Sequence, residues 1–572
     1  MRIRIRPGKL IVWLFTLLSS LGVVSAIVIT TNDISTTESA AAEHVDQNDL
    51  RQLVATGRRH EAFEAAFEGG DELFETTFNA LDGVGANVGQ GQRFTSVPRA
   101  DLRGPNEWMS HRPIRFTGPN ASSCISCHSK PFDDGAGDPS TAVHRDPFRT
   151  GQLSMFIQRD TPPLFGMGAL QRLGEEMTDA LQSQREQLRR TLCDRGGTSS
   201  VNLSAKGIGF GTLAGTRTRA NPCAVTFNTD GVRGVDYEGT PPELVVKPFQ
   251  WKGSVASLRD FARGAAHNEL GMQAVEITGD RVDGDFDGVS DELTVGDITS
   301  FAVYLAAQPR PTTLAELASL RLIEPLPAAQ TAAIQRGRMV FNQIGCDACH
   351  TPSLTIDNPT FSEPSQNAAF RDGANFPAGQ PTVSRGVDPQ FAITFDLTSD
   401  QPDNVIDGTH LGSFAKDNRG RAVVELFSDL KRHEMGSQLV ESVNEIAGTD
   451  AAPNPSNPKN RNTSGTFITK ALWGVGSTAP YLHDGRATTL SEAILEHATG
   501  GANDTSEAAP ARRRYIGLPA ADQQALIAFL NSLVLFRAEE ENGVTVATIA
   551  PQGVDLNIPR GQPRRRNGPP RR

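Results

Sequence analysis

The chain has 572 residues, of which 38% are hydrophobic and 21% are charged. This composition predicts a globular body, and the length is too great for a single hydrophobic core. The formal net charge of −11 argues against nucleic acid as a partner. Two domains with extensions are therefore the starting expectation.

The first residues are typical of an export signal. Basic side chains precede the apolar run 10–18, and Val24-Ser25-Ala26 offers small residues for cleavage. Because the apolar character continues to Ile29, the segment is also long enough to span a bilayer if it is not cut. We expect residues 1–26 to be a signal peptide or a membrane anchor. The body is then periplasmic and contacts a membrane only through such an anchor.

The two ends of the remaining chain carry no recognisable chemistry. We expect residues 27–100 to form a helical extension, because apolar side chains recur at helical spacing around Phe63, Phe67, Leu73 and Phe78. Residues 541–572 predict a disordered basic tail, since RGQPRRRNGPPRR contains no apolar residue that could anchor it. An anionic partner for this tail is the alternative.

Two Cys-x-x-Cys-His motifs are the strongest chemical signal. Thiols at this spacing can both bond the vinyl groups of one haem, and the adjoining histidine can ligate its iron. A structural zinc site is the alternative, but it needs a second cysteine pair nearby. The sequence therefore predicts two covalently bound haem c groups. Their ligands are Cys124, Cys127 and His128 for the first haem and Cys346, Cys349 and His350 for the second.

The remaining cysteines, Cys193 and Cys223, belong to neither motif. Thiols in an oxidising compartment tend to pair, so one disulfide is expected between them. Two buried free cysteines are the alternative.

Flanking segments predict a helix near each haem motif. RGRMVFNQIG precedes the second motif, and LTVGDITSFAVYLAAQ and LPAADQQALIAFLNSLVLF carry helical apolar spacing. Proline-bearing stretches at 309–311 and 324–327 suggest a linker, and the Gly- and Pro-rich stretches suggest long loops. We expect a mainly α fold with two cytochrome c-like domains, residues 101–311 and 329–540, joined by a linker at 312–328.

The two halves can also be aligned with each other. TPPLFGMG (161–168) resembles TKALWGVG (469–476), and WKGSVASLRDF (251–261) aligns without gaps with HDGRATTLSEA (483–493). Because the matching segments occur in the same order in both predicted haem domains, the sequence suggests a duplication. Chance similarity of short segments is the alternative.

Two segments carry a resemblance to a known family. APYLHDGRATTLSEAILEH (479–497) and the stretch 251–272 resemble the bacterial di-haem cytochrome c peroxidase superfamily. Within it, the chain is most similar to the di-haem oxidoreductases, a family of proposed peroxidases, over about residues 117–535. The resemblance implies two packed cytochrome c-like domains. One haem would react with peroxide, and the other would store or deliver electrons.

The resemblance also implies two catalytic residues. Trp251 matches the tryptophan that lies between the haems as an electron bridge, and Glu269 in HNELGM matches the acid–base group beside the peroxide. A carboxylate suits this role because breaking an O–O bond needs a proton moved between its oxygens. Two positions depart from the family pattern: Phe261 stands where these peroxidases keep a glutamine, and the Trp-to-Glu spacing is slightly shorter than theirs. Core packing for Trp251 and a solvated charge for Glu269 are the alternatives.

The sequence also offers candidates for the distal iron ligands. His144 follows His128 by 16 positions, which is similar to the separation between the proximal and distal histidines at the peroxide-reacting haem of the superfamily. A surface histidine is the alternative for His144, and His267 is the next candidate for the distal ligand. For the second haem, the thioether of Met435 is the first candidate, and a thioether ligand raises the reduction potential. The neighbouring His433 and a purely packing role for Met435 are the alternatives. His483 is expected to hydrogen-bond near this haem.

A calcium loop is expected in DGDFDGVSDEL. Alternating carboxylates with glycine at the sixth place suit a hard cation in a tight turn. The twelfth position is Thr294 and not the glutamate of an EF-hand, so only a calcium loop is predicted; a polar turn is the alternative. The expected ligands are Asp283, Asp285, Asp287 and Asp291.

These observations predict an exported di-haem c-type cytochrome oxidoreductase that reduces peroxide or a related small oxidant at one haem. The other haem would relay electrons from a redox partner protein, such as a small cytochrome or a copper protein. A non-catalytic electron carrier is one alternative. An oxidase of a protein or organic substrate is another, because related enzymes also run in that direction.

Overall fold

The computed structural model describes residues 41–84, 121–137, 141, 143–145, 157–237, 239–283, 288–371, 387–399, 405–406, 409–410, 414–440, 465–501, 504–541 and 544–549. All of them belong to one compact unit that begins at Ala41. The predicted signal or anchor and the arginine-rich end of the chain lie outside these residues. No helix within the described ranges is both long enough and apolar enough to cross a membrane.

Helices and several small sheets make up the described residues, so the expected helical, loop-rich fold is confirmed in part. The helices are α1 (Gln47–Ala55), α2 (Arg59–Glu75), α3 (Met167–Arg195), α4 (Leu258–Ala265), α5 (Val275–Thr278), α6 (Val295–Ala307), α7 (Leu314–Ser319), α8 (Ala328–Gln343), α9 (Leu490–Glu496), α10 (Ala509–Ile516) and α11 (Ala520–Asn531). Short 3-10 turns include η2 (Cys124–Ser126), η5 (Cys346–Ala348) and η8 (Val475–Ser477), and η4 (Ala266–Leu270) is a π-helix.

The strands are short except in one sheet and in the last hairpin. They are β1 (Val143–Arg145), β2 (Ile157–Arg159), β3 (Thr198–Ala205), β4 (Ile208–Arg219), β5 (Ala224–Val232), β6 (Thr312–Thr313), β7 (Leu354–Ile356), β8 (Thr360–Glu363), β9 (Ile393–Asp396), β10 (Val405–Ile406), β11 (Thr409–His410), β12 (Ala415–Lys416), β13 (Ala422–Val424), β14 (Arg432–Glu434), β15 (Thr466–Ile468), β16 (Leu533–Val534), β17 (Phe536–Glu541) and β18 (Val544–Ile549). The paired strands are antiparallel, and no described sheet has more than three strands.

In the first half, α2 packs against α6. Gly70 permits the close approach, because a Cβ at this position would collide with the carbonyl oxygen of Ser300 on α6. Phe67 and Phe74 lie on either side of the contact, each with its ring centroid 5.4 Å from that of Tyr304. The helical pattern expected in this part of the chain is therefore confirmed, and α2 forms part of the first core.

The second half repeats this arrangement with α8 and α11. Gly337 on α8 lies so close to the carbonyl oxygen of Ala525 on α11 that a Cβ would not fit. The Phe341 ring packs edge-on against Phe529, with centroids 5.6 Å apart. This pair forms a second core together with α9 and the segment around Tyr481.

The internal repeat is confirmed by matching local structure. Isolated bridges join Phe249 to Val255 and Tyr481 to Ala487, at the same offset along the chain. Each bridge is followed by a helix, α4 or α9, whose N-cap hydroxyl accepts a hydrogen bond from the backbone N–H three residues later. The glycines of the other aligned pair, Gly166 and Gly474, both have left-handed φ values, +73° and +75°. Two short sequence similarities thus mark the same structural unit twice.

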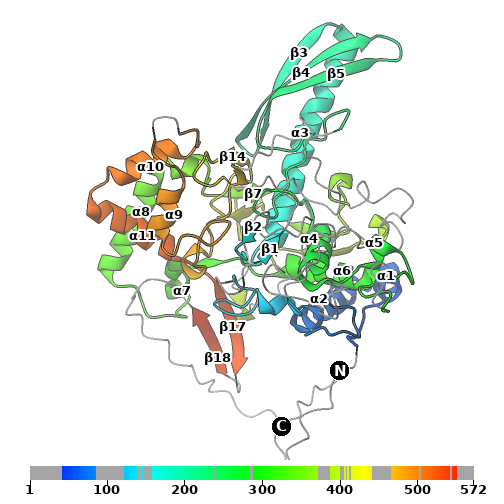
Figure 1. Cartoon of the computed structure of the whole chain (residues 1–572), viewed down its shortest axis with the longest axis horizontal. Coiled ribbons are helices and arrows are strands. Elements are labelled where there is room, and N and C mark those ends of the chain that lie inside the picture. The colour runs from blue at the N-terminus through cyan, green and yellow to red at the C-terminus, as the bar shows by residue number, and fades with distance from the viewer. Residues whose placement is uncertain are drawn as a thin grey trace, which may run out of the picture. The chain divides into compact units, whose positions relative to one another are not determined.

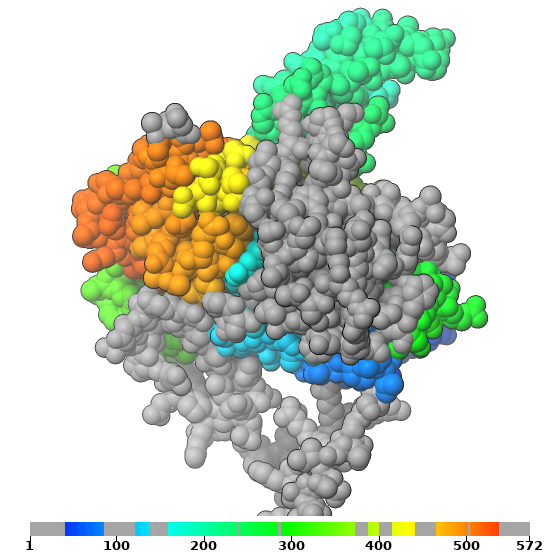
Figure 2. Space-filling model, viewed as in Figure 1, coloured from blue at the N-terminus to red at the C-terminus, as the bar shows by residue number. Residues whose placement is uncertain are grey.

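The β3–β4–β5 sheet was not expected from the sequence. Figure 1 shows it alongside the C-terminal half of α3. The β3–β4 connection is Lys206-Gly207, both with positive φ, as a two-residue hairpin turn requires. Leu203, Phe210 and Leu213 are buried on the α3 side, whereas the tips of the strands are exposed (Figure 2).

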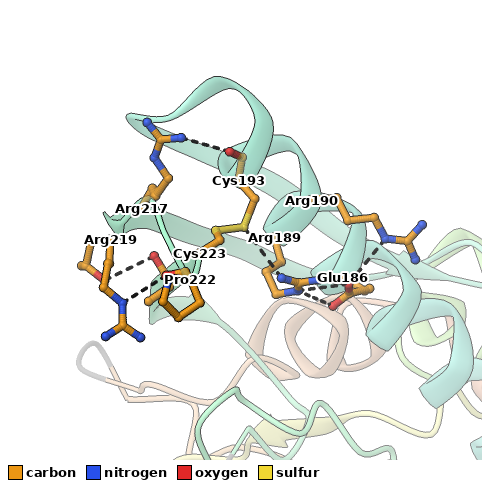
Figure 3. Close-up of a disulfide and its surroundings, with 10 residues drawn as sticks. Glu186, Arg189, Arg190, Cys193, Arg217, Arg219, Pro222 and Cys223 are labelled. Carbon is orange, nitrogen blue, oxygen red and sulfur yellow. Dashed lines mark hydrogen bonds and ion pairs between the residues drawn. A yellow bond between two sulfur atoms is a disulfide. The ribbon is translucent and has the colours of Figure 1, made fainter.

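The expected disulfide between Cys193 and Cys223 is confirmed, with their Cα atoms 5.8 Å apart. It joins the end of α3 to the start of β5 (Figure 3). Arg217 on β4 donates a hydrogen bond of 3.0 Å to the carbonyl oxygen of Cys193. The disulfide and this bond hold the sheet against the helix.

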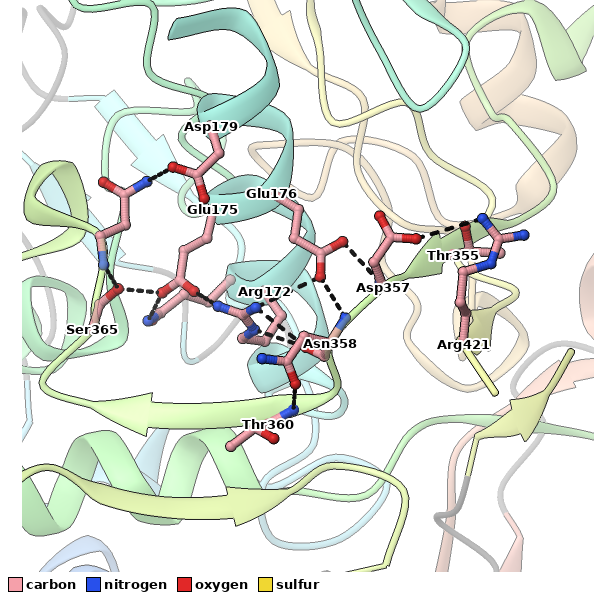
Figure 4. Close-up of polar contacts among 12 residues, drawn as sticks. Arg172, Glu175, Glu176, Asp179, Thr355, Asp357, Asn358, Thr360, Ser365 and Arg421 are labelled. Carbon is pink, nitrogen blue, oxygen red and sulfur yellow. Dashed lines mark hydrogen bonds and ion pairs between the residues drawn. The ribbon is translucent and has the colours of Figure 1, made fainter. Parts of the chain in front are cut away.

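The N-terminal half of α3 contacts the second half of the chain. Glu176 accepts hydrogen bonds of 2.9 Å from the backbone N–H groups of Asp357 and Asn358, and Arg172 donates to the carbonyl oxygen of Asn358 (Figure 4). Ser365 donates to Glu175 at 2.7 Å. Strands β7 to β9 also share the hydrophobic core of the first half. The two halves are therefore joined through an extensive polar and apolar contact.

We predict that Gly166→Ala destabilises the protein more than Gly197→Ala does. Both glycines have φ near +75°, so both substitutions cost about 1 kcal/mol of backbone strain. A Cβ at Gly166 would lie 2.7 Å from the Trp473 ring, whereas a Cβ at Gly197 meets no atom within 4 Å. Overpacking at Gly166 should therefore add about 1–3 kcal/mol. Equal losses of stability in thermal unfolding of the two variants would contradict this account of the Trp473 contact.

Candidate functional site

The second Cys-x-x-Cys-His motif follows the end of α8. Gly345 ends the helix with φ +83°, and the next residues form the η5 turn, in which the His350 backbone N–H donates to the Cys346 carbonyl oxygen at 2.9 Å. This turn places both thiols and the imidazole at one cavity. Local backbone geometry therefore brings the three motif side chains together, as the sequence predicts.

The cavity beside this motif has a volume of about 450 Å³. Its wall is largely apolar and comes from α8, α9, α11 and the segment between β15 and η8. The volume is in the usual range for small-molecule and cofactor sites. Apolar members of the wall include Phe341, Leu439, Leu472, Trp473, Tyr481, Leu490, Leu526 and Leu530.

His350 is prepared to ligate a metal. Its Nδ1 lies 3.1 Å from the carbonyl oxygen of Phe427, and because a carbonyl can only accept, Nδ1 carries the proton and Nε2 keeps its lone pair. Burial lowers the pKa of His350 to about 4. The imidazole is therefore neutral at neutral pH, which is the form that binds iron.

The first motif has the same features. Its 3-10 turn η2 ends with the His128 backbone N–H donating to the Cys124 carbonyl oxygen at 3.1 Å, and His128 Nδ1 lies 3.2 Å from the Gly135 carbonyl oxygen. Burial lowers the pKa of His128 to about 4, although hydrogen bonds to the backbone at Gly135 and Pro162 oppose this shift. The Phe74 ring of α2 lies 6.0 Å from the imidazole.

Both motifs fit covalently bound haem. None of the four motif thiols forms a disulfide, and burial raises the pKa of Cys124, Cys127 and Cys346 to about 12. At the second motif, two thiols and a neutral imidazole line an apolar cavity, an arrangement that suits haem attachment.

The zinc alternative fits less well. One group in the described residues could hold a metal through its donor atoms, namely Cys349, Asp429 and His433, but it omits Cys346. Both ring nitrogens of His433 already face carboxylates, Asp429 Oδ2 and Glu507 Oε2, each at 2.8 Å. Although burial acts in the opposite direction, hydrogen bonds to Asp429, Cys349 and Glu507 raise the pKa of His433 to about 11. A histidine protonated on both nitrogens has no lone pair for a metal.

The same observation bears on the distal ligand of the second haem. His433 was the alternative to Met435, and its protonated ring argues against it. Met435 lines the cavity, and its backbone N–H is bonded to the Gly465 carbonyl oxygen at 2.8 Å. Met435 therefore remains a candidate ligand.

His497 is a further candidate that the sequence reasoning missed. It lies at the end of α9 and lines the same cavity, with its ring centroid 6.4 Å from that of His350. Its Nδ1 lies 2.6 Å from the Ala493 carbonyl oxygen, which leaves the Nε2 lone pair available, and burial lowers its pKa. The signal that could have found it is its place in ILEH, at the end of the helix that follows HDGR.

Trp251 also lines this cavity. Its Nε1 donates a 2.9 Å hydrogen bond to the Asp160 carbonyl oxygen, and the Asp160 N–H donates to the His483 carbonyl oxygen at 2.7 Å. Pro162, two residues further on, also lines the cavity, and its backbone bonds to His128 of the first motif. The structure thus places Trp251 beside the loop 160–163, which lies between the first motif and the cavity of the second motif.

Glu269 lies near the first motif. It belongs to the π-helix η4, and its backbone oxygen accepts a 3.0 Å hydrogen bond from Ala121, three residues before Cys124. Burial is the main cause of the raised pKa of Cys127, and the charge of Glu269 also raises it, so the carboxylate lies near this motif. The predicted acid–base residue and the predicted haem site are therefore neighbours.

A buried ion cluster fixes the π-helix at both ends. Arg259 and Arg263 on α4, before the π-helix, both pair with Glu276 on α5, after it. Arg259 also pairs with Glu363 on β8 at 2.8 Å. Phe261 stands where the resemblance expects a glutamine, and its ring lies 5.9 Å from that of Phe249, so it contributes packing and no hydrogen bond.

The remaining predicted residues are placed only in part. His144 pairs with Gln158 in the β1–β2 register, but its side chain lies outside the description, and His267 is buried two residues before Glu269. In the calcium loop, Asp283 accepts from the Gly288 N–H at 3.0 Å and Asp291 accepts from the Arg281 N–H. Asp285 and Asp287 lie outside the described residues, so His144 and calcium remain predictions.

Comparison with known proteins supports the family prediction. Residues 404–533 match the family model described as "Di-haem oxidoreductase, putative peroxidase". This region is therefore similar to the di-haem oxidoreductase family. The match contains β14, the Met435 segment and the cavity wall from β15 to α11, and it begins after the second haem motif. It supports an oxidoreductase with haem cofactors, without fixing a substrate.

Solved structures show weaker similarity to this chain. Hydrazine synthase of Kuenenia stuttgartiensis, pressurized with xenon, is 16% identical over 43% of this chain and 57% of that chain, with a TM-score of 0.20. A MauG-like protein associated with microbial copper homeostasis is 18% identical over 50% of this chain and 68% of that chain, with a TM-score of 0.24. The chain thus spans less than two thirds of the first of these proteins. No curated protein matches the chain.

Proposed function

We propose that the protein is an exported, periplasmic di-haem c-type cytochrome oxidoreductase that reduces peroxide or a related small oxidant. The observation that carries the proposal is the cavity of about 450 Å³, which is lined by both thiols and the neutral histidine of the second motif and also by Trp251. The family match over residues 404–533 supports the redox class.

Haem bound at both motifs would supply the one-electron chemistry and the site for the oxidant. Cys124 and Cys127 would hold one haem and His128 would ligate it, and Cys346, Cys349 and His350 would do the same for the other. The apolar cavity wall would exclude water from the second haem.

Glu269 would move protons at the first site. A half-buried carboxylate that faces the first motif can take a proton from the oxidant's inner oxygen and return it to the outer one. Trp251 would carry electrons between the sites, because it borders the second cavity and bonds to the loop that reaches His128. The electron donor would be a small cytochrome or a copper protein.

A non-catalytic electron carrier is the second candidate function. The half-buried Phe261 at the expected glutamine position favours it, since it removes one polar group from the peroxide site. In that case both irons would be six-coordinate, and neither cyanide nor peroxide would change the haem spectrum.

The first prediction concerns haem number. Replacing Cys124 and Cys127 by alanine should leave one covalent haem per chain, because each thiol pair holds one haem. Replacing Cys346 and Cys349 by alanine should also leave one haem. The variant with all four substitutions should hold no covalent haem. Mass spectrometry and haem absorption of the denatured, purified protein measure this directly. Cys193→Ala with Cys223→Ala is the matched control and should keep two haems, since this pair forms the disulfide. Wild-type protein with fewer than two haems would exclude the proposal.

The second prediction concerns the sixth ligand of the second haem. Met435 and His497 both line the cavity, so removing the true ligand should open this iron and raise its high-spin EPR signal. We expect Met435→Ala to produce this change and His497→Ala to leave the second haem six-coordinate. The reverse result would assign the ligand to His497, and no change in either variant would exclude both.

The third prediction concerns proton transfer. Glu269→Gln keeps the shape but loses the acid–base group, and general acid–base catalysis typically contributes about 100- to 10,000-fold. We therefore expect kcat for peroxide reduction to fall by about 100-fold or more, with unchanged haem content. Glu64→Gln, an exposed position on α2, is the control and should be silent. If Glu269→Gln keeps full turnover, Glu269 is not the proton-transfer group.

A further inference from the structure

A half-buried lysine lies over Trp251, the proposed bridge. Lys470 Nζ is 5.2 Å from the ring centroid of Trp251, within the range of a cation–π contact. Both side chains line the cavity beside the second motif. Lys470 follows Thr469, whose backbone N–H is bonded to the Lys431 carbonyl oxygen at 3.0 Å, so the position of the chain is fixed.

The charge of Lys470 has no strong counterion among the described residues. Burial alone lowers its pKa to about 8, with no contribution from a neighbouring carboxylate. The side chain is still only half-buried by exposed area, because one side of it faces the cavity. Lys252 nearby differs, since its Nζ donates to the Thr466 carbonyl oxygen at 3.0 Å and lies over Phe467. Among the described residues, Lys470 is therefore the cation over the Trp251 ring.

The ammonium of Lys470 would repel any positive charge on the indole of Trp251. Two like charges about 5 Å apart in a protein interior repel by an amount that changes an equilibrium by more than about tenfold. If Trp251 passes an electron by losing one of its own, the indole becomes positively charged for a moment. The neighbouring ammonium makes that state less favourable.

We propose that Lys470 controls the oxidation of Trp251 and thereby limits electron passage between the two haem sites. This inference rests on the proposed function. After the proposed oxidant, peroxide, has taken electrons from a haem bound at the first site, Trp251 would give that site one electron and would regain one electron from a ferrous haem bound at the second site. The first site is reduced by the one electron that the second site loses, and peroxide is the oxidant that drives the transfer. Lys470 is a positioning residue in this scheme, since it touches the bridge and not the oxidant.

The test measures electron transfer between the haems in the purified, half-reduced di-haem protein, as the rate at which the second haem is oxidised after rapid mixing with peroxide. Lys470→Met removes the charge and keeps the length, and Lys470→Arg keeps the charge. We expect the Met variant to transfer electrons about tenfold faster or more and the Arg variant to behave as the wild type. The increase should vanish when Trp251→Phe is also present, because the charge then has no bridge to act on.

Several outcomes would overturn the inference. They are an unchanged rate in Lys470→Met, an equal increase in the Trp251→Phe background, or a shift of a haem midpoint potential large enough to explain the change. The last result would show that the ammonium instead pairs with a carboxylate of the haem. If Trp251→Phe alone leaves the rate unchanged, the bridge in the proposed function is wrong, and the role of Lys470 is wrong with it. Covalent haem content and thermal unfolding confirm that each variant folds.

Discussion

The loop from Asp160 to Pro163 is the constraint on which the relation between the two sites depends. Its Asp160 backbone bonds to Trp251 on one side and to His483 on the other, and its Pro162 backbone bonds to the histidine of the first motif. Pro163 and its neighbours also form part of the wall of the second cavity. Because the loop leads directly into α3, a shift of this helix would move both sites together.

The two cores are built in the same manner around their motifs. In each, a glycine lets one helix approach a second helix closely, and aromatic rings fill the space toward the motif histidine. Each histidine is then held neutral by burial and oriented by a backbone carbonyl. Backbone groups cannot be lost by side-chain mutation, so the orientation of these imidazoles depends on the fold more than on any single neighbouring residue.

The parts of the protein with strict local rules could be predicted from sequence. Cys-x-x-Cys-His spacing, helical periodicity and the aligned pair 251–261 and 483–493 all correspond to observed structure. Contacts between residues far apart in the chain could not be predicted from the sequence. His433 gave no signal that Glu507 would occupy its second nitrogen, and His497 looked like an ordinary helix-end residue. The β3–β5 sheet was missed because its turn is Lys-Gly and not the stronger Asn-Gly, although both residues have positive φ.

The disulfide at the end of α3 has a consequence for maturation. Two of the six cysteines form a disulfide with each other, and the other four belong to the two proposed haem motifs, so the newly made chain must keep the two groups of thiols from pairing wrongly. Cys193 and Cys223 close a short loop whose ends meet through a local hairpin and helix, while the two motif pairs lie far from it along the chain. Early closure of this loop would remove the oxidised pair from competition and leave the remaining thiols available for thioether formation.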